Sequence, residues 1–377
     1  MRDASNVIAK LCALAIIEGS MAQDSMENIL SFRSHLTSGI SDFAAFLEWQ
    51  TKDVEWLTEL IVILANYQEE GLQLYPVVFI AKRLELILSK LDGKVSITVG
   101  SGPNTNHTVR RAFKQCAPLA EDREWSLFIE IRDDELVYGV FRIDQSPLKP
   151  TAFERLRQIK NPAVKVIGLT RLGGSFVELR AASERHLYVD LSGSVGESYN
   201  PPRLLRAFTD VISRQAPAAV RTLLRGFYYQ VLVDLLHAKH GALIAVIPKG
   251  SKIYSGFLSD GVFLNPEIRV CKGISEYIES DAPEHHMQSL RSWKQLLRKM
   301  SSMDGITILD SSGSIIGYNC FISGSPLEPR ALESLNGIRL GGARKRAFDL
   351  LCSYLGQGFE GVFYRSQDGS AEFETTP

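Results

Sequence analysis

Apolar residues recur every three or four positions in the first part of the chain, and this spacing predicts helices. The clearest stripe runs through Phe43, Phe46 and Leu47 and continues at Trp56, Leu57, Leu60, Ile61 and Leu64. A second amphipathic run is Val77–Leu91. Because such spacing places apolar side chains on one helix face, residues 1–92 are predicted to form a helical N-terminal segment whose aromatic residues pack in a core.

Alternation of apolar and polar positions begins at Lys94 and predicts strands. Lys94–Val99 alternates, ends in Gly100-Ser101-Gly102-Pro103, and precedes a helical pattern at Asn106–Cys116. A glycine loop before a helix can hold a phosphate. Without a third spaced glycine or a Gly-Lys-Ser/Thr sequence, a tight turn is the preferred interpretation. Further strands are predicted at Ser126–Ile131, Leu136–Ile143, Val164–Leu169, Ser175–Leu179 and His186–Leu191, so residues 93–200 predict an α/β domain.

The third region begins after Ser192–Pro202, which is rich in Gly, Ser and Pro and is typical of a linker. A long helical pattern, Leu204–His237, leads into an apolar strand ending at Val246. A helical pattern at Gln288–Met300 precedes the strand Ile306–Leu309. These alternating elements predict a third domain, residues 201–377, and an α/β (α+β) class for the whole chain.

One pattern occurs in both the second and the third domain. The hairpin Leu127–Ile143 is followed by Ser146-Pro147-Leu148-Lys149-Pro150, and the hairpin Ile306–Ile322 is followed by Ser325-Pro326-Leu327-Glu328-Pro329. The repetition indicates either a duplicated unit or a coincidence of hairpin chemistry. If the unit is duplicated, the earlier copy lacks the Asp-Gly and basic motifs of the later copy and is expected to bind rather than to catalyse.

Composition is that of an ordinary globular protein. The chain has 377 residues, a net charge of −1 and 45% hydrophobic residues. A net charge near zero provides no general attraction to nucleic acid or anionic lipid. No stretch reaches the length of about 18 apolar residues that a membrane helix requires. The five cysteines are scattered without metal-ligand spacing, so a reducing, cytoplasmic location is expected.

Candidate chemistry lies near the end of the chain. Asp304-Gly305 precedes a strand, and Gly341-Gly342-Ala343-Arg344-Lys345-Arg346 combines a glycine turn with three cations at the start of a predicted helix. A carboxylate can hold a divalent metal ion. A helix N-terminus with Arg and Lys can hold phosphates. Together the two motifs predict a polyphosphate site.

These motifs resemble the two signatures of the diadenylate cyclase family, an Asp-Gly-Ala tripeptide and an Arg-His-Arg tripeptide. Here they are Asp304-Gly305-Ile306 and Arg344-Lys345-Arg346. The resemblance is collinear over about residues 220–376. It implies a mixed central sheet flanked by helices, preceded by a sensor domain. It also implies that two ATP molecules are condensed to cyclic di-AMP by a homodimer or larger homo-oligomer with facing sites.

The resemblance implies a role for each motif residue. Asp304 would hold Mg²⁺ or Mn²⁺ and, with Gly305, form the catalytic motif. Gly342, Ala343, Arg344, Lys345 and Arg346 would bind the nucleotide phosphates. Lys345 replaces the family's His, Ala343 replaces a Thr, and Ile306 replaces an Ala. These departures leave open an alternative in which the domain is a nucleotide-binding signalling module with little or no turnover.

Two further candidates are less specific. Ser255-Gly256 follows the strand that ends at Val246 and either approaches the nucleotide or forms a simple bend. Glu284-His285-His286 suggests a metal site, but adjacent histidines do not share a face and no third ligand is suitably spaced. An exposed loop is the preferred interpretation of that tripeptide.

Overall fold

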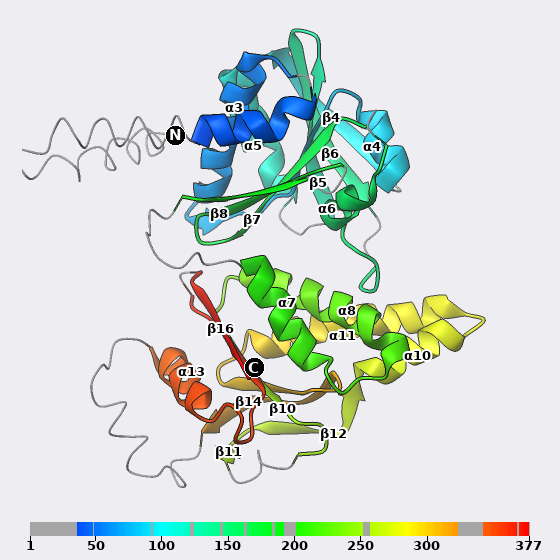
Figure 1. Cartoon of the computed structure of the whole chain (residues 1–377), viewed down its shortest axis with the longest axis vertical. Helices are drawn as coiled ribbons and strands as arrows, with labels where there is room; N and C mark the ends of the chain where they lie inside the picture. Colours follow the sequence, from blue (N-terminus) through cyan, green and yellow to red (C-terminus); the bar gives the residue numbers. More distant parts are fainter. Residues whose placement is uncertain are drawn as a thin grey trace, which may run out of the picture. The chain divides into compact units, whose positions relative to one another are not determined.

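The chain forms two units, each built on its own β-sheet (Figure 1). The first comprises Met1–Asp144, Ala152–Arg171 and Ser175–Ser192, and the second Gln145–Thr151, Leu172–Gly174 and Gly193–Pro377. The computed structural model describes residues 36–47, 49–91, 93–120, 124–143, 146–161, 164–182, 185–191, 201–251, 257–322, 342–367 and 369–376. Both large sheets are mixed and carry helices, which confirms the α/β prediction.

The first unit has a seven-stranded sheet in the order β4-β6-β5-β3-β7-β8-β9. Strand β3 is parallel to β5 and antiparallel to β7. Its elements after the helical stretch 36–44 are η1 (Ala45–Leu47), α3 (Thr51–Asn66), β1 (Gln68–Glu69), β2 (Leu72–Gln73), β3 (Val78–Ala81), α4 (Leu84–Leu91), β4 (Gly93–Pro103), α5 (Asn106–Cys116), η2 (Ala117–Ala120), β5 (Trp125–Arg132), β6 (Glu135–Ile143), α6 (Ala152–Arg155), η3 (Leu156–Gln158), β7 (Val166–Gly173), β8 (Phe176–Ala181) and β9 (His186–Asp190).

The central strand β3 explains why both faces of this sheet are covered. Val78 and Ile80 belong to the core that includes residues of α3 and α5, whereas Phe79 and Ala81 belong to the core that includes residues of α4 and α6. Successive side chains of a strand point to opposite faces, so a strand between two helical layers must be apolar throughout. The helical prediction for Val77–Leu91 is therefore wrong in its first part, because a short apolar run does not distinguish a buried strand from a helix.

The predicted glycine loop after Val99 is also wrong. Gly100 and Gly102 lie inside β4, where they pair with Tyr138 and Leu136 of β6. A Cβ on Gly100 would stand 2.6 Å from the Tyr138 hydroxyl oxygen, and one on Gly102 would stand 2.9 Å from the Thr108 hydroxyl oxygen. Close packing of neighbouring side chains inside a strand, rather than a turn, accounts for these two glycines.

The second unit also has a seven-stranded sheet, in the order β11-β14-β13-β10-β15-β16 with β12 paired to β14. Strand β10 is parallel to β13 and antiparallel to β15. Its described elements are α7 (Pro201–Ile212), α8 (Ala218–Leu236), β10 (Ala242–Ile247), β11 (Leu258–Ser259), β12 (Val262–Arg269), α10 (Val270–Glu279), α11 (Pro283–Ser301), β13 (Ile306–Asp310), β14 (Ser314–Ile322), α13 (Ala343–Ser353), β15 (Gly361–Arg365) and β16 (Ala371–Thr375).

Alternate residues of β10 again face two cores. Ile244 and Val246 pack with residues of α7, α8, α10 and α11, and Leu243 and Ala245 pack with residues of α13. Figure 1 shows the four helices gathered together and α13 apart from them. The helix predicted over Leu204–His237 is two helices, α7 and α8, because the chain turns at 213–217 and α8 begins after Pro217. No helix among the described residues has the length and apolarity needed to cross a bilayer.

The two units share one strand topology. Strands β4, β6, β5, β3, β7 and β8 of the first sheet correspond, in their order across the sheet and along the chain, to β12, β14, β13, β10, β15 and β16 of the second. In both sheets the parallel pair is central, at β3–β5 and β10–β13. The repeated hairpins of the sequence are β5–β6 and β13–β14, at equivalent positions. This correspondence favours duplication over coincidence, although Ser325–Pro329 lies outside the described residues.

Candidate functional site

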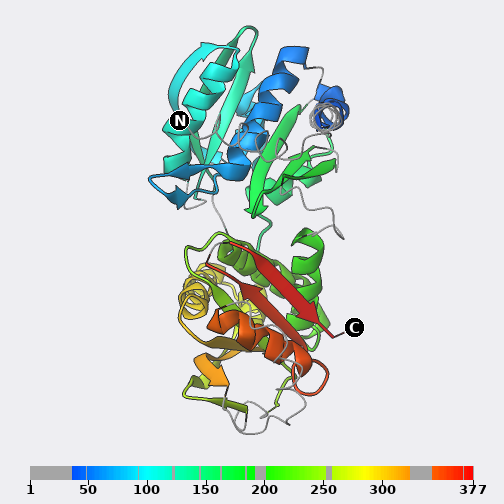
Figure 2. The same cartoon turned by 90° about the vertical axis from the view of Figure 1, so that its left-hand side faces the viewer.

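The described residues of the two predicted motifs lie at one edge of the second sheet, where β10 and β13 begin and β15 ends. Strands β10 and β13 are parallel, so the residues before them, Gly241 and Asp304, lie at the same edge. Strand β15 is antiparallel to β10 and pairs Arg365 with Ala242 there. Helix α13 begins beside this edge, and Figure 2 shows it in orange across the red strands β15 and β16.

Gly305 determines how Asp304 is presented. Its φ of +87° lies in the left-handed region, which side chains with a Cβ rarely adopt. A Cβ at this position would stand 2.8 Å from the Asn319 carbonyl carbon and 2.8 Å from the Cys320 carbonyl oxygen. Glycine is thus needed twice, for the backbone turn between α11 and β13 and for the close approach of β14.

The basic motif forms the first turn of α13. Gly342 is the N-cap residue, with φ −69° and ψ 173°. Because glycine has no side chain, it cannot cap the first N–H groups of the helix. No acidic residue lies in the first turn. The first N–H groups of a helix have no intrahelical partner and carry partial positive charge. The motif therefore adds the charges of Arg344, Lys345 and Arg346 to a helix end that already favours an anion.

Asp304 and Arg344 meet, as the two motifs predict. An Arg344 Nη2 donates to Asp304 Oδ1 at 2.7 Å and also approaches the Met303 carbonyl oxygen at 3.3 Å. The Asp304 side chain is 88% exposed and that of Arg344 26%. The acid is therefore open to a ligand, while Arg344 is held mostly within the protein.

Gly241 leaves the space that Arg344 occupies. A Cβ on Gly241 would stand 2.8 Å from Arg344 Nη1 and 2.8 Å from the Arg365 carbonyl oxygen. Arg365 is itself buried and donates to the carbonyl oxygens of Leu236 and His240, each at 2.9 Å. Neither role was predicted from the sequence. A glycine directly before a buried apolar strand was the available signal for Gly241, whereas nothing in the local sequence signals a buried Arg365.

Lys345 is held differently from Arg344. Its ammonium lies 2.6 Å from Glu372 Oε2 and 2.9 Å from Asp349 Oδ1. It also lies 4.6 Å from the centre of the Phe348 ring. Burial lowers the pKa of Lys345, but hydrogen bonds and attraction from Glu372 and Asp349 outweigh it, so its pKa lies above the usual value. Two carboxylates thus already balance the charge of Lys345.

Of the remaining residues that the sequence predicts for a site, some lie within the described ranges and some outside them. Ala343 and Arg346 lie on the first turn of α13 and are exposed. Ser255-Gly256 lies outside the described residues. The His285-His286 pair is in the first turn of α11, so the predicted loop there is wrong. Pro283 begins that helix, and proline is favoured at a first helical position. His286 Nδ1 lies 3.6 Å from Glu276 Oε2.

One carboxylate at this edge is available to a metal ion. Within the described residues, no three His, Cys, Asp or Glu side chains form a cluster that could hold a metal ion. Asp304 provides one accessible carboxylate. Mg²⁺ commonly uses one or two carboxylates together with the phosphates of a nucleotide. The edge therefore fits a metal ion that arrives with a polyphosphate, rather than one held by the protein alone.

The described residues at the counterpart edge of the first unit are arranged differently. When the two hairpins are aligned from Leu127 and Ile306, Trp125 stands in place of Asp304 and Ser126 in place of Gly305. The helix in place of α13 is α6, which has only four residues. The first unit instead pairs Glu124, the residue before β5, with Arg142 of β6 at 3.3 Å, so among the described residues the pair between this strand start and the first turn of a helix belongs to the second unit.

Comparison with family models, curated proteins and solved structures found no match for this chain. Function is therefore inferred from the chemistry of this edge and from the motif resemblance.

Proposed function

We propose that the second unit is a nucleotidyltransferase that condenses two ATP molecules into cyclic di-AMP and pyrophosphate. The ion pair between Asp304 and Arg344 carries this proposal, because it joins the two motifs, 40 positions apart, at 2.7 Å. A carboxylate and a guanidinium at one helix N-terminus can act on the same triphosphate. The collinear resemblance of both motifs to diadenylate cyclases supports the choice of reaction.

Each residue has a role that suits its chemistry. Arg344 binds a phosphate. Phosphate oxygens can accept two parallel hydrogen bonds from the N–H groups of a guanidinium, as carboxylate oxygens can. The pair with Asp304, whose carboxylate is 88% exposed and therefore screened by water, is worth only about 0–1 kcal/mol, so a phosphate can replace the carboxylate at little cost. The released Asp304 accepts a hydrogen bond from the ribose 3′-hydroxyl and orients it. The first N–H groups of α13 and Arg346 hold the remaining phosphate oxygens.

Mg²⁺ or Mn²⁺ bound with the triphosphate would neutralise the negative charge that develops at the α-phosphate. Asp304 is the residue of this edge that would hold it. The chain's own contribution is positioning and electrostatic stabilisation, which dominate phosphoryl-transfer catalysis.

The reaction requires two copies of the chain. In each half-reaction the 3′-oxygen of one ATP attacks the α-phosphorus of the other and forms an ester bond. The anhydride bond between the α- and β-phosphates breaks, pyrophosphate leaves, and the proton of the 3′-hydroxyl passes to solvent. Two such steps close the ring, and each ATP is nucleophile once and electrophile once. One chain has a single Asp304–Arg344 pair, so we propose a homodimer, or a larger homo-oligomer of such pairs, in which two sites face each other.

The first unit is proposed to regulate rather than to catalyse. Trp125 cannot replace Asp304 as a ligand for a metal ion or as a partner for the 3′-hydroxyl. This assignment keeps the two units distinct in role although they share a topology.

A second function is favoured by Lys345. Its charge is already balanced by Glu372 and Asp349, whereas a phosphate-binding cation must have charge to offer. If Lys345 stays so engaged, the second unit binds a nucleotide without turning it over. This alternative predicts that the protein binds ATP but forms no cyclic product. It also predicts that Lys345→His leaves the ATP affinity unchanged.

The deciding experiment is a turnover assay with the full chain, ATP and either Mg²⁺ or Mn²⁺. Cyclic di-AMP is expected from the wild type. Because Asp304→Asn keeps the shape and removes the charge, product should fall by at least about a hundredfold, on the scale of losing one preorganised electrostatic contact.

Asp281→Asn is the matched control. Asp281 is exposed and precedes α11, so the same substitution there should leave the rate unchanged. Arg344→Gln and Arg206→Gln, the latter on the exposed side of α7, form a second pair. Equal rates for Asp304→Asn and Asp281→Asn, or no cyclic product from any of the four common nucleoside triphosphates, would reject the cyclase proposal.

A further inference from the structure

The segment 146–151, which we call the strap, belongs to the second unit, although the elements on both sides of it in the chain, β6 and α6, belong to the first. It contains Ser146-Pro147-Leu148-Lys149-Pro150, the earlier of the two repeated motifs, to which the proposed function assigns no role. Because the chain leaves the first unit for the strap and then returns, a change in the first unit can reach the second through this segment.

A buried leucine and two backbone carbonyl groups anchor the strap. Leu148 is 5% exposed and packs in the core that includes residues of α8 and α11. The Ser146 hydroxyl donates to the sulfur of Met287, on α11, at 3.2 Å. The side-chain nitrogen of Gln230, on α8, donates to the carbonyl oxygens of Ser146 at 3.3 Å and of Lys149 at 2.6 Å. These contacts hold the strap against α8 and α11.

Gln230 joins the strap to α11. It is 3% exposed, and its Oε1 accepts a hydrogen bond from the Lys294 ammonium, on α11, at 2.9 Å. Both ends of one amide are therefore in use, the nitrogen on the strap and the oxygen on α11. A buried amide that loses its partners raises the free energy of the fold. Withdrawal of the strap therefore favours a new orientation of Gln230, which also breaks its bond to Lys294.

Helix α11 carries this link toward Asp304. Lys294 also pairs with Asp234 of α8 at 3.1 Å, and Arg298, one turn later, lies 3.8 Å from the same carboxylate. The Ser302 hydroxyl donates to the Arg298 carbonyl oxygen at 2.8 Å, and Asp304 follows two residues after Ser302. The turn that presents Asp304 is thus tied to the part of α11 that α8 holds.

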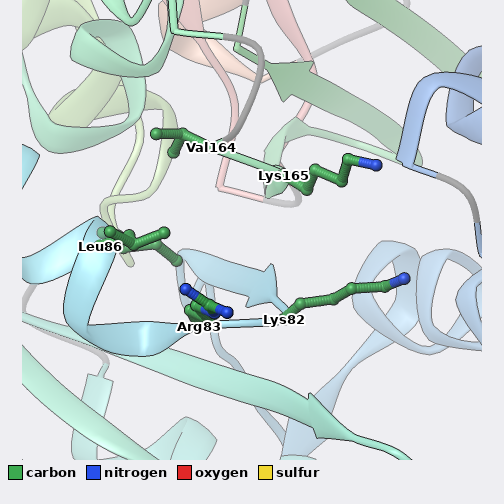
Figure 3. A pocket seen from close by; sticks show the side chains of 6 residues that line it. Lys82, Arg83, Leu86, Val164 and Lys165 are labelled. Atoms are coloured by element: carbon green, nitrogen blue, oxygen red, sulfur yellow. The ribbon is translucent and has the colours of Figure 1, made fainter.

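At its other end the strap runs directly into α6 of the first unit. Ala152, the first residue of α6, packs in one core with Ile87 of α4 and with Val164. Val164 and Leu86 line a hollow of about 350 Å³ (Figure 3). The core that follows the strap in the chain therefore borders a space into which its side chains can move when the first unit changes.

We propose that the strap regulates the candidate active site by positioning Asp304 through Gln230 and α11. This inference rests on the proposed function, because it concerns the regulation of that site. With the strap docked, α8 holds α11 and the Asp304 turn is fixed. When a change in the first unit withdraws the strap, Gln230 loses two acceptors, α11 loosens, and turnover falls. Gln230 is a positioning residue and does not touch the substrate.

Hydrogen exchange of the full chain without nucleotide tests the link independently of turnover. Gln230→Leu keeps the size of the side chain and removes the amide, so peptides covering residues 294–305 should exchange at least about tenfold faster, as expected when buried hydrogen bonds are lost. The matched control is Gln288→Leu, at an exposed position of α11, which should leave this exchange unchanged.

A second pair of variants weakens the strap itself. Leu148→Ala removes its buried anchor and leaves Gln230 in place, so exchange should again be faster at residues 294–305. Leu119→Ala makes the same change at a residue that is 52% exposed and should have no effect there.

A third pair tests whether the first unit acts through the strap. Phe153 of α6 and Phe113 of α5 are both buried in the first unit. Phe153→Leu changes the helix that follows the strap and should speed exchange at residues 294–305. Phe113→Leu disturbs the first unit elsewhere and should not. Equal acceleration by these two variants would overturn the proposal, since it would reflect a general loss of stability.

Turnover separates this inference from the proposed function. Gln230→Leu and Leu148→Ala should each lower kcat at least about tenfold with little change in the KM for ATP, because Asp304 is displaced while the phosphate-binding start of α13 is intact. Unchanged exchange in both variants, or unchanged kcat despite faster exchange, would overturn the proposed regulation. Faster exchange in a chain that makes no cyclic di-AMP would reject the proposed function and support the link from the strap to Asp304.

Discussion

Replacing Gly305 by alanine tests the local geometry that holds Asp304 beside Arg344. A residue with a Cβ at φ +87° costs about 1–2 kcal/mol in backbone energy. The new Cβ would also stand 2.8 Å from backbone atoms of Asn319 and Cys320, and such overpacking costs about 1–3 kcal/mol. The free energy of unfolding of the second unit should therefore fall by about 2–5 kcal/mol, a large part of the 5–15 kcal/mol typical of a domain.

The matched control is Gly226→Ala. Gly226 lies within α8 and has no heavy atom within 4 Å of an added Cβ. Alanine is favoured over glycine in a helix interior by about 0.5–1 kcal/mol. The same chemical change should thus stabilise the protein at one site and destabilise it at the other.

The free energy of unfolding of both variants is measured by urea denaturation, with hydrogen exchange used to monitor unfolding. Because the chain has two units, the transition must be assigned to the second one, using peptides that cover β13 and β14. A loss of less than about 1 kcal/mol for Gly305→Ala would refute the reasoning. It would show that β14 can move away from the turn and that Asp304 is not fixed by the sheet.

Two further predictions concern groups beside the same edge. Glu372→Gln should destabilise the second unit by up to about 1 kcal/mol near pH 8, because it removes a partner of Lys345 at 2.6 Å. The pKa of Lys345 is raised, so this contribution to stability is present below the usual lysine pKa and is lost as pH rises through the raised value. The free energies of unfolding of wild type and variant, plotted against pH, should therefore converge at high pH. A difference that stays constant with pH would contradict the assignment. Burial raises the pKa of the Cys320 thiol to about 11 and that of Cys116 to about 12, so neither should react with iodoacetamide at pH 8 in the folded protein, and mass spectrometry that finds rapid labelling of Cys320 would show that β14 opens.

The local sequence was enough to predict most of the elements. Helix α5 has the bounds Asn106–Cys116 that its pattern predicts, and β5, β6, β8 and β9 lie within two residues of their predicted ends. Periodicity succeeds for α5 because one face of that helix lies in a core and its apolar positions repeat accordingly. Strands β5 and β6 face two cores, and they could be predicted because a turn at Asp133-Asp134 separates two short apolar runs. The motif residues Asp304 and Arg344 could be paired before the structure because their residue types are suited to the same ligand.

The tertiary structure decided what periodicity could not express. Val78–Ala81 is apolar on both sides because helices cover both faces of its sheet, a fact that no local pattern contains. Gly100 and Gly102 belong to a strand because neighbouring side chains leave no room for a Cβ. Lys345 is balanced by Glu372, which lies 27 positions away in the chain. Contacts between distant segments depend on the fold, so the sequence alone determined the elements and the candidate pair, and the fold decided their neighbours and charge balance.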